Sequence, residues 1–176
     1  MNLNHLRDCA YKCACDHGFH DEELSNEHCI MLVITELSES VEADRKNHYC
    51  ETDKCKRLLS LGKEFDYVFC NFIKDTVEDE LADTCIRLFD LAGLRNLNLN
   101  RFAFVNVVSK KKTFTENIYA IVKDIMNYKY SLEEQVNYAI TQVFSFADIL
   151  GIDLLWHIEK KMAYNELRPK LHGKKY

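Results

Sequence analysis

Two pairs of acidic residues stand three positions apart in segments whose apolar residues follow a helical period. Glu36 and Glu39 lie in one segment, and Glu80 and Asp83 lie in the other. Because each residue of an α-helix turns by about 100°, side chains three positions apart project from one face. Carboxylates held side by side among apolar neighbours repel each other, and a divalent cation relieves that repulsion. The spacing therefore predicts a site for a hard cation such as Mg²⁺ or Mn²⁺.

The apolar stripes of the two segments predict how the acid pairs meet. In both segments the stripe is centred about a third of a turn from the acid row, so packing the two helices aims both pairs into one crevice. Four converging carboxylates form an oxygen site of the octahedral kind, which suits hydrolysis of a phosphate chain by an activated water. The stripes comprise Ile30, Val33, Ile34, Leu37 and Val41, and Val77, Leu81, Cys85, Leu88 and Ala92.

A simpler interpretation of the acid pairs is a solvated helix face. Acids three apart are common on exposed helices, and Glu42 follows Glu39 by three positions, so the register of the first pair is not unique. Arg87 falls one turn after Asp83, where it could be only a helix-stabilising partner. Spacing alone leaves both interpretations open.

The carboxyl-terminal segment carries a cluster of basic and polar residues. Lys161, Asn165 and Arg168 are spaced i, i+4 and i+7, which places them on one helical face. A lysine amine and a guanidinium hold phosphate oxygens, while the Asn165 amide or the Tyr164 ring can contact a sugar or base. Alternatively, the cluster is a basic helix end favoured by the helix dipole. The basic residues continue beyond this face with His172, Lys174 and Lys175.

Length and composition limit the class of protein. The 176 residues, with 47% hydrophobic and 29% charged, predict one domain that buries roughly two-thirds of its unfolded surface and exclude a disordered chain. The net charge of −5 argues against a broad nucleic-acid-binding surface. With no signal-like start and no apolar run of about 18 residues, we expect a soluble, cytoplasmic protein without a membrane or nucleic-acid partner.

Few glycines and one proline predict helices nearly throughout. The five glycines stand too far apart for G-x-G-x-x-G or a Walker loop, so a nucleotide must be held in another way. The segment 94–113 is compatible with either a short strand or a connecting helix. Residues 48–62 are polar and predict a loop that can include a helical turn, and the tail after Pro169 is expected to be extended chain. Helices are expected over about 3–17, 25–47, 63–92, 114–128, 131–150 and 154–167, with ends marked by Gly18, Gly93, Ser131 with Glu134, Gly151 and Asp153.

The eight cysteines are expected to be reduced in such a chain. Thiols and imidazoles crowd together in only one segment, which lacks the paired C-x-x-C knuckles of a structural zinc site. A zinc site and a helix carrying half-buried thiols both remain open there. The residues concerned are Cys9, Cys13, Cys15, His17 and His20.

Taken in order, these segments resemble the MazG-like all-α NTP pyrophosphohydrolases, a family related in fold to dimeric dUTPases and dCTP pyrophosphatases. ITELSESVEADRK is similar to the E-x-x-E helix of that family, and EDELADTCIRLFDLAG to its E-x-x-D helix. IEKKMAYNELRPKLHGKKY is similar to its closing Lys, Tyr-Asn and Arg motif. The 40 residues between Glu39 and Glu80 exceed the usual spacing, so we expect an insertion around 48–70.

The resemblance implies an all-α helical bundle in a single domain over 1–176, assembled as a dimer or tetramer. It implies that Glu36, Glu39, Glu80 and Asp83 hold Mg²⁺ while water splits an NTP or dNTP into a monophosphate and pyrophosphate. Substrate would be bound by Lys161, Tyr164, Asn165 and Arg168, with Lys174 and Lys175 as weaker candidates.

Other classes of protein make different demands on the sequence. A helical protein-interaction module would use the acidic and basic faces to dock a partner and would need no metal. A ferritin-like di-iron bundle needs Glu-x-x-His, and no Glu here has a His three positions later. A thiol-dependent hydrolase needs one activated cysteine, which the sequence does not single out.

Overall fold

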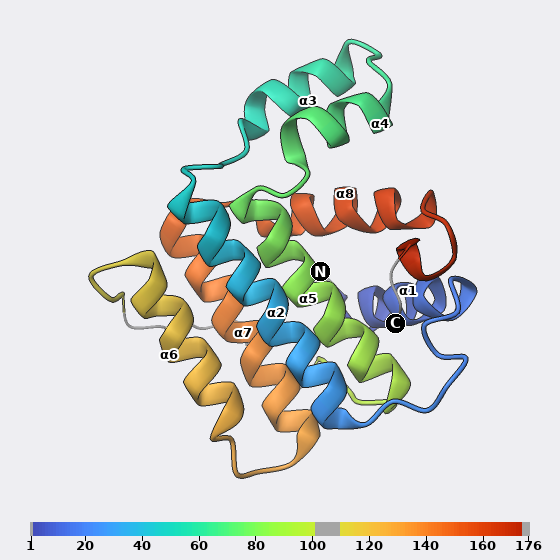
Figure 1. The fold of residues 1–176 in the computed structure, drawn as a ribbon, viewed down its shortest axis with the longest axis vertical. Helices are drawn as coiled ribbons and strands as arrows, with labels where there is room; N and C mark the ends of the chain where they lie inside the picture. Colours follow the sequence, from blue (N-terminus) through green and yellow to red (C-terminus); the bar gives the residue numbers. More distant parts are fainter. Residues whose placement is uncertain (1, 101–109, 174–176) are drawn as a thin grey trace.

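The computed structural model describes residues 2–100 and 110–173, and within these ranges the chain is all-α with no strand (Figure 1). The all-α class predicted from the sequence is therefore confirmed. Of the segment predicted as either strand or helix, residues 101–109 lie outside the described residues. The α-helices are α1 (Leu3–Asp16), α2 (Asn26–Arg45), α3 (Thr52–Ser60), α4 (Phe65–Val68), α5 (Val77–Leu94), α6 (Phe114–Met126), α7 (Leu132–Leu150) and α8 (Leu154–Glu166). A π-helical turn, η1 (Phe69–Ile73), lies between α4 and α5, and a 3₁₀ turn, η2 (Lys170–Gly173), follows α8.

Helix α5 is the centre of the fold. It packs against α1, α2, α7 and α8, and Figure 1 shows α8 crossing one end of the group formed by α2, α5, α6 and α7. The stripe predicted for α5 is buried throughout, as are Val33 and Leu37 of α2. Full burial of a side chain such as Leu88 stabilises the fold by about 1.5–3 kcal/mol. The residues of the α5 stripe are Val77, Leu81, Cys85, Leu88 and Ala92.

The prediction of one helix over 63–92 is wrong, because the chain leaves the helix between η1 and α5. Asp75 has a left-handed backbone (φ 61°), and its amide donates to Asp79 Oδ2 over 3.0 Å. Thr76 then begins α5 as its N-cap, with Oγ1 accepting from the Asp79 amide. A threonine cap satisfies an otherwise free helix amide and stabilises the start of a helix by about 1 kcal/mol.

The segment 48–62, expected as a loop that can include a helical turn, contains the nine-residue helix α3. Together α3, α4 and η1 project beyond the end of the bundle (Figure 1). They have a small core of their own, formed by Cys55, Val68, Phe69 and Ile73, against which Trp156 and Tyr164 of α8 pack.

Most of the predicted helix ends are confirmed. Gly18 and Gly151 adopt left-handed backbones after α1 and α7, and Ser131 forms a capping box with Glu134. The exception is Gly93, which lies inside α5 rather than after it. A Cβ at this position would overlap the side chain of Tyr11, so Gly93 allows α1 to approach α5 closely.

The segment after Pro169 is not simply extended. It turns through η2 and returns to α1, where the Leu171 amide donates to the His17 carbonyl over 2.9 Å and Lys170 pairs with Asp21. Lys174 and Lys175 lie outside the described residues. Over the described ranges, no single helix has both the length and the apolar composition to cross a membrane; only α7 and α8 together do, and they are bent by 115°.

Candidate metal centre

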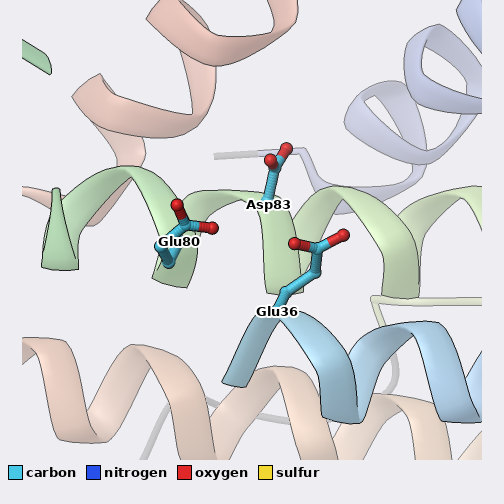
Figure 2. Close-up of side chains that lie close together, drawn as sticks. All are labelled: Glu36, Glu80 and Asp83. Carbon is cyan, nitrogen blue, oxygen red and sulfur yellow. The ribbon is translucent and has the colours of Figure 1, made fainter. Parts of the chain in front are cut away.

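Three of the four predicted carboxylates meet between α2 and α5. Glu36 comes from α2, Glu80 and Asp83 come from α5, and their ligand oxygens lie within 4.8 Å of one another (Figure 2). Glu36 and Glu80 are only 3% and 5% exposed, and Asp83 is half-buried. The packing of α2 on α5 thus brings acids 44 or more positions apart in the chain into one group of oxygens.

Glu39 has a more exposed position than the other three acids. It lies one turn after Glu36 on α2, outside the group of three. It lines an open groove of about 360 Å³ together with Glu80, Glu42 and Lys46. Glu39 therefore lies beside the group of Glu36, Glu80 and Asp83, on the side that faces solvent, and is not a member of that group.

Burial and mutual repulsion raise the pKa values of the acids in this group. Burial, reinforced by the charges of Asp83 and Asp79, raises the pKa of Glu80 to about 8. Burial and the charge of Asp83 also raise the pKa of Glu36, although Arg87 opposes this effect. Oxygen-only ligands crowded in this way fit Mg²⁺ or Mn²⁺, because a divalent cation would stabilise the ionised forms.

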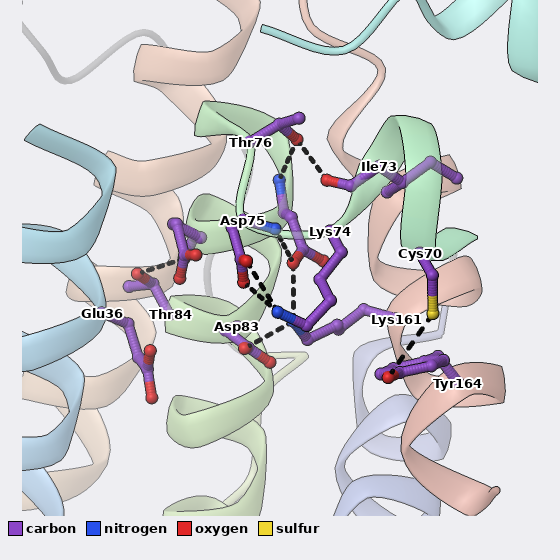
Figure 3. A network of polar contacts seen from close by, with 12 residues as sticks. Glu36, Cys70, Ile73, Lys74, Asp75, Thr76, Asp83, Thr84, Lys161 and Tyr164 are labelled. Atoms are coloured by element: carbon purple, nitrogen blue, oxygen red, sulfur yellow. Dashed lines mark hydrogen bonds and ion pairs between the residues drawn. The ribbon is translucent and has the colours of Figure 1, made fainter. Parts of the chain in front are cut away.

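Lys161 enters the site from α8 and joins two aspartates of α5. Its Nζ lies 2.7 Å from Asp79 Oδ2 and 2.8 Å from Asp83 Oδ2, and Figure 3 shows it beside Asp83. Burial alone would lower the pKa of Lys161, but the two aspartates outweigh burial and raise it. Burial raises the pKa of Asp79 to about 6 although Lys161 opposes the rise. The ammonium is therefore a built-in counter-ion of the acidic group.

Arg87 is the second cation at the site. Its Nε donates to Glu36 Oε1 over 3.0 Å, so the guanidinium links α5 to α2. This contact between two helices adds to the helix-stabilising role considered for Arg87, because the charge of Asp83 one turn earlier also raises the pKa of the guanidinium.

Asp79 and this contact of Arg87 with Glu36 were not predicted from the sequence. Asp79 is fully buried, and its Oδ1 has no hydrogen-bond partner within the described part of the chain. Its position four residues before Asp83 was a usable signal, because i, i+4 spacing puts both on one face. Its partner Lys161 is 82 positions away, which no local pattern indicates.

Besides Lys161, two of the predicted substrate-binding residues lie near the acids. Asn165 and Arg168 line a cavity of about 50 Å³ that also reaches Asp83 and Arg87. Asn165 is 7% exposed, and its Oδ1 has no hydrogen-bond partner among residues 2–100 and 110–173. An amide oxygen of this kind is available to a ligand or a water molecule in the cavity.

Tyr164 does not line this cavity. Its ring stacks on Phe69 with a centroid distance of 4.2 Å, and its hydroxyl lies 3.8 Å from Cys70 Sγ (Figure 3). The Arg168 guanidinium lies 5.9 Å from the ring centroid. Tyr164 thus connects α8 to the projecting helices.

The thiols and imidazoles near α1 have separate partners. Cys13 Sγ lies 3.6 Å from His17 Nδ1, while His17 Nε2 contacts the Arg168 carbonyl and His20 Nε2 contacts Asp90. In residues 2–100 and 110–173, the groups suited to a metal are Glu36 with Glu80 and Asp83, and Asp75 with Asp79 and Glu80. This favours the interpretation of the segment as half-buried thiols over a zinc site.

Comparisons with protein-family models, with curated proteins and with solved structures found no match to this chain. The chemistry of the site is therefore inferred from its own residues.

Proposed function

We propose that this protein is a Mg²⁺-dependent nucleoside triphosphate pyrophosphohydrolase, which converts an NTP or dNTP and water into a nucleoside monophosphate and pyrophosphate. The observation that carries the proposal is the meeting of Glu36, Glu80 and Asp83 from two helices, with ligand oxygens within 4.8 Å of one another. The order of the acidic and basic motifs, which resembles the MazG-like enzymes, supports the same reaction.

Carboxylates are the metal-holding groups in this proposal. Glu36, Glu80 and Asp83 would hold Mg²⁺ or Mn²⁺, and Glu39 would reach it from the neighbouring groove. When bound, such a cation polarises a phosphoryl oxygen and makes a water molecule more acidic. One of these carboxylates takes the proton of the attacking water, which is the task of a general base.

Side chains around the acids would orient the metal ligands and the substrate. Arg87 fixes the Glu36 carboxylate through its hydrogen bond. Lys161 and Arg168 supply positive charge for the phosphates, and the free Oδ1 of Asn165 accepts a hydrogen bond from the nucleoside. Tyr164, which is half-buried, stays a candidate for contact with the nucleoside. Lys174 and Lys175 stay weaker candidates for phosphate binding.

A homo-oligomer, either a dimer or a tetramer, is part of the proposal because the resemblance implies it. Light scattering coupled to size-exclusion chromatography measures the mass in solution directly. A mass of 20.7 kDa at micromolar concentration would contradict this part of the proposal.

The test of the proposed function is release of pyrophosphate and monophosphate from a panel of NTPs and dNTPs with Mg²⁺, with Mn²⁺ and with EDTA. Metal-dependent release that is lost in Glu39→Ala and Asp83→Ala, with helicity unchanged, supports the proposal. Glu42→Ala is the matched control, because Glu42 lies one turn after Glu39 and lines the same groove. No release by a folded protein would favour the helical interaction module.

A further inference from the structure

Lys161 is shared between two carboxylates that have different surroundings. Asp83 belongs to the acid group with Glu36 and Glu80, whereas Asp79 does not. The Lys161 Nζ lies at nearly the same distance from each, 2.8 Å from Asp83 and 2.7 Å from Asp79. The ammonium therefore has one partner within the candidate metal centre and one outside that group.

Asp79 is held rigidly where it lies. It is fully buried in the first turn of α5, where its amide donates to the Thr76 hydroxyl. Its Oδ2 accepts both from Lys161 and from the Asp75 amide. The side chain of Asp83 is 20% exposed, whereas the Asp79 side chain has no exposure at all.

A cation bound at the acid group would compete with Lys161 for Asp83. If Asp83 were the only anion beside Lys161, a metal ion that bound Asp83 would leave the buried Lys161 ammonium without a counter-ion. An unpaired buried charge costs several kcal/mol in proteins. Asp79 supplies a second anion, 2.7 Å from the ammonium. Lys161 can then give up Asp83 without becoming unpaired.

We infer that Asp79 is a positioning residue that retains Lys161 when Asp83 binds the divalent cation. This inference rests on the metal centre of the proposed function. In this role Asp79 does not contact the substrate but acts through Lys161. Asp79 keeps the positive charge of Lys161 beside the metal centre, where a phosphate chain would bind.

The competing interpretation is that Asp79 itself binds a second cation with Asp75 and Glu80, using its unpaired Oδ1. Lys74 opposes this, because its Nζ lies within 2.7 Å of both carboxylate oxygens of Asp75. The two interpretations predict different metal stoichiometries, so one binding experiment separates them.

The experiment is titration of the nucleotide-free full chain with Mn²⁺, with free Mn²⁺ measured by electron paramagnetic resonance. Asp79→Asn should weaken Mn²⁺ binding at least tenfold, equivalent to about 1.4 kcal/mol, because Lys161 then has only Asp83 as a charged partner. Asp75→Asn is the matched control and should bind within about twofold of the wild type, because Asp75 is exposed and paired with Lys74. Wild-type affinity in Asp79→Asn overturns the inference, as does loss of a second Mn²⁺ site in both variants.

A second pair of variants tests whether Asp79 acts through Lys161. In a Lys161→Met background, the further change Asp79→Asn should leave Mn²⁺ affinity unchanged within about twofold, because the group that Asp79 retains is gone. A further tenfold loss would mean that Asp79 acts on the cation directly and would overturn the inference. Circular dichroism establishes that each variant is folded; if Lys161→Met does not fold, the titration of Asp79→Asn still decides.

Failure of this inference and failure of the proposed function give different results. Weakened Mn²⁺ binding in Asp79→Asn, without hydrolysis of any nucleotide by the wild type, supports the inference and rejects the pyrophosphohydrolase. Hydrolysis by the wild type, with unchanged Mn²⁺ binding in Asp79→Asn, rejects the inference alone. A wild-type protein that binds no Mn²⁺ rejects both.

Discussion

Replacement of Glu80 by glutamine should stabilise the metal-free protein, and more strongly at pH 8 than at pH 6. Glu80 is buried beside Asp83 and Asp79, and its pKa is raised to about 8. Glutamine has nearly the same shape as a protonated glutamate but cannot ionise. The variant therefore removes the cost of ionisation while keeping the packing.

The direction of the pH effect follows from proton linkage. The unfolded chain releases the Glu80 proton near pH 4.5 and the folded chain near pH 8, so between these values the folded state binds one proton more. Stability therefore falls as the pH rises through this window. From pH 6 to pH 8 the loss amounts to about 2–3 kcal/mol. Asp79, with a pKa of about 6, acts in the same direction but mainly below this range.

The assay is thermal unfolding in EDTA at pH 6, 7 and 8. In a domain of this size, about 2–3 kcal/mol corresponds to about 5–10 °C in Tm, so the advantage of Glu80→Gln should grow by that amount from pH 6 to pH 8. Glu159→Gln, on the exposed side of α8, serves as the control and should follow the wild-type curve. Mg²⁺ should raise the wild-type Tm most at pH 8, because it stabilises the ionised acids.

Parallel curves for the wild type and Glu80→Gln between pH 6 and pH 8 would refute this reasoning. That result would mean that Glu80 ionises without penalty in the folded protein. The acids would then not be crowded enough to need a cation.

Three further changes test the packing that supports the site. Lys161→Met should lower the free energy of unfolding by about 3–5 kcal/mol in urea titrations, because it leaves Asp79 buried without its cation; an unchanged midpoint would contradict the buried ion pair. Gly93→Ala should destabilise the protein by about 1–3 kcal/mol in the same assay, since its Cβ meets Tyr11, and a stabilised variant would show that α1 does not approach this closely. Ser131→Ala should cost about 1 kcal/mol through loss of the capping box, and an equal Tm would count against that cap.

The sequence by itself determined the all-helical class and many of the helix ends, because both depend on neighbours within a few positions. Ser131 and Glu134 are three apart and cap α7, and Gly151 ends it with a left-handed backbone. The apolar stripe of α5 could be predicted for the same reason, because the helical period alone determines which residues share the buried face of the helix. The convergence of Glu36, Glu80 and Asp83 also followed from the positions of the acid rows relative to these stripes.

Predictions from local sequence patterns were wrong where a helical apolar period and a helix-interrupting pair of residues lay in the same segment. Residues 63–92 have enough apolar periodicity for one helix, yet Asp75 and Thr76 interrupt it through contacts with Asp79. Nor could the sequence alone indicate that the segment around α3 has its own small core, because that core also packs against Trp156 and Tyr164 of α8, which lie far away in the chain.

Only the tertiary structure decided the charge balance of the site. Lys161 and Asp79 are 82 positions apart, and Arg87 and Glu36 are 51 apart, so their pairing depends on how α8 and α2 pack on α5. The same packing leaves Glu39 at the solvent side while its neighbour Glu36 is buried. Helical spacing states which side chains share a face, but burial and ion pairing depend on which other helix covers that face.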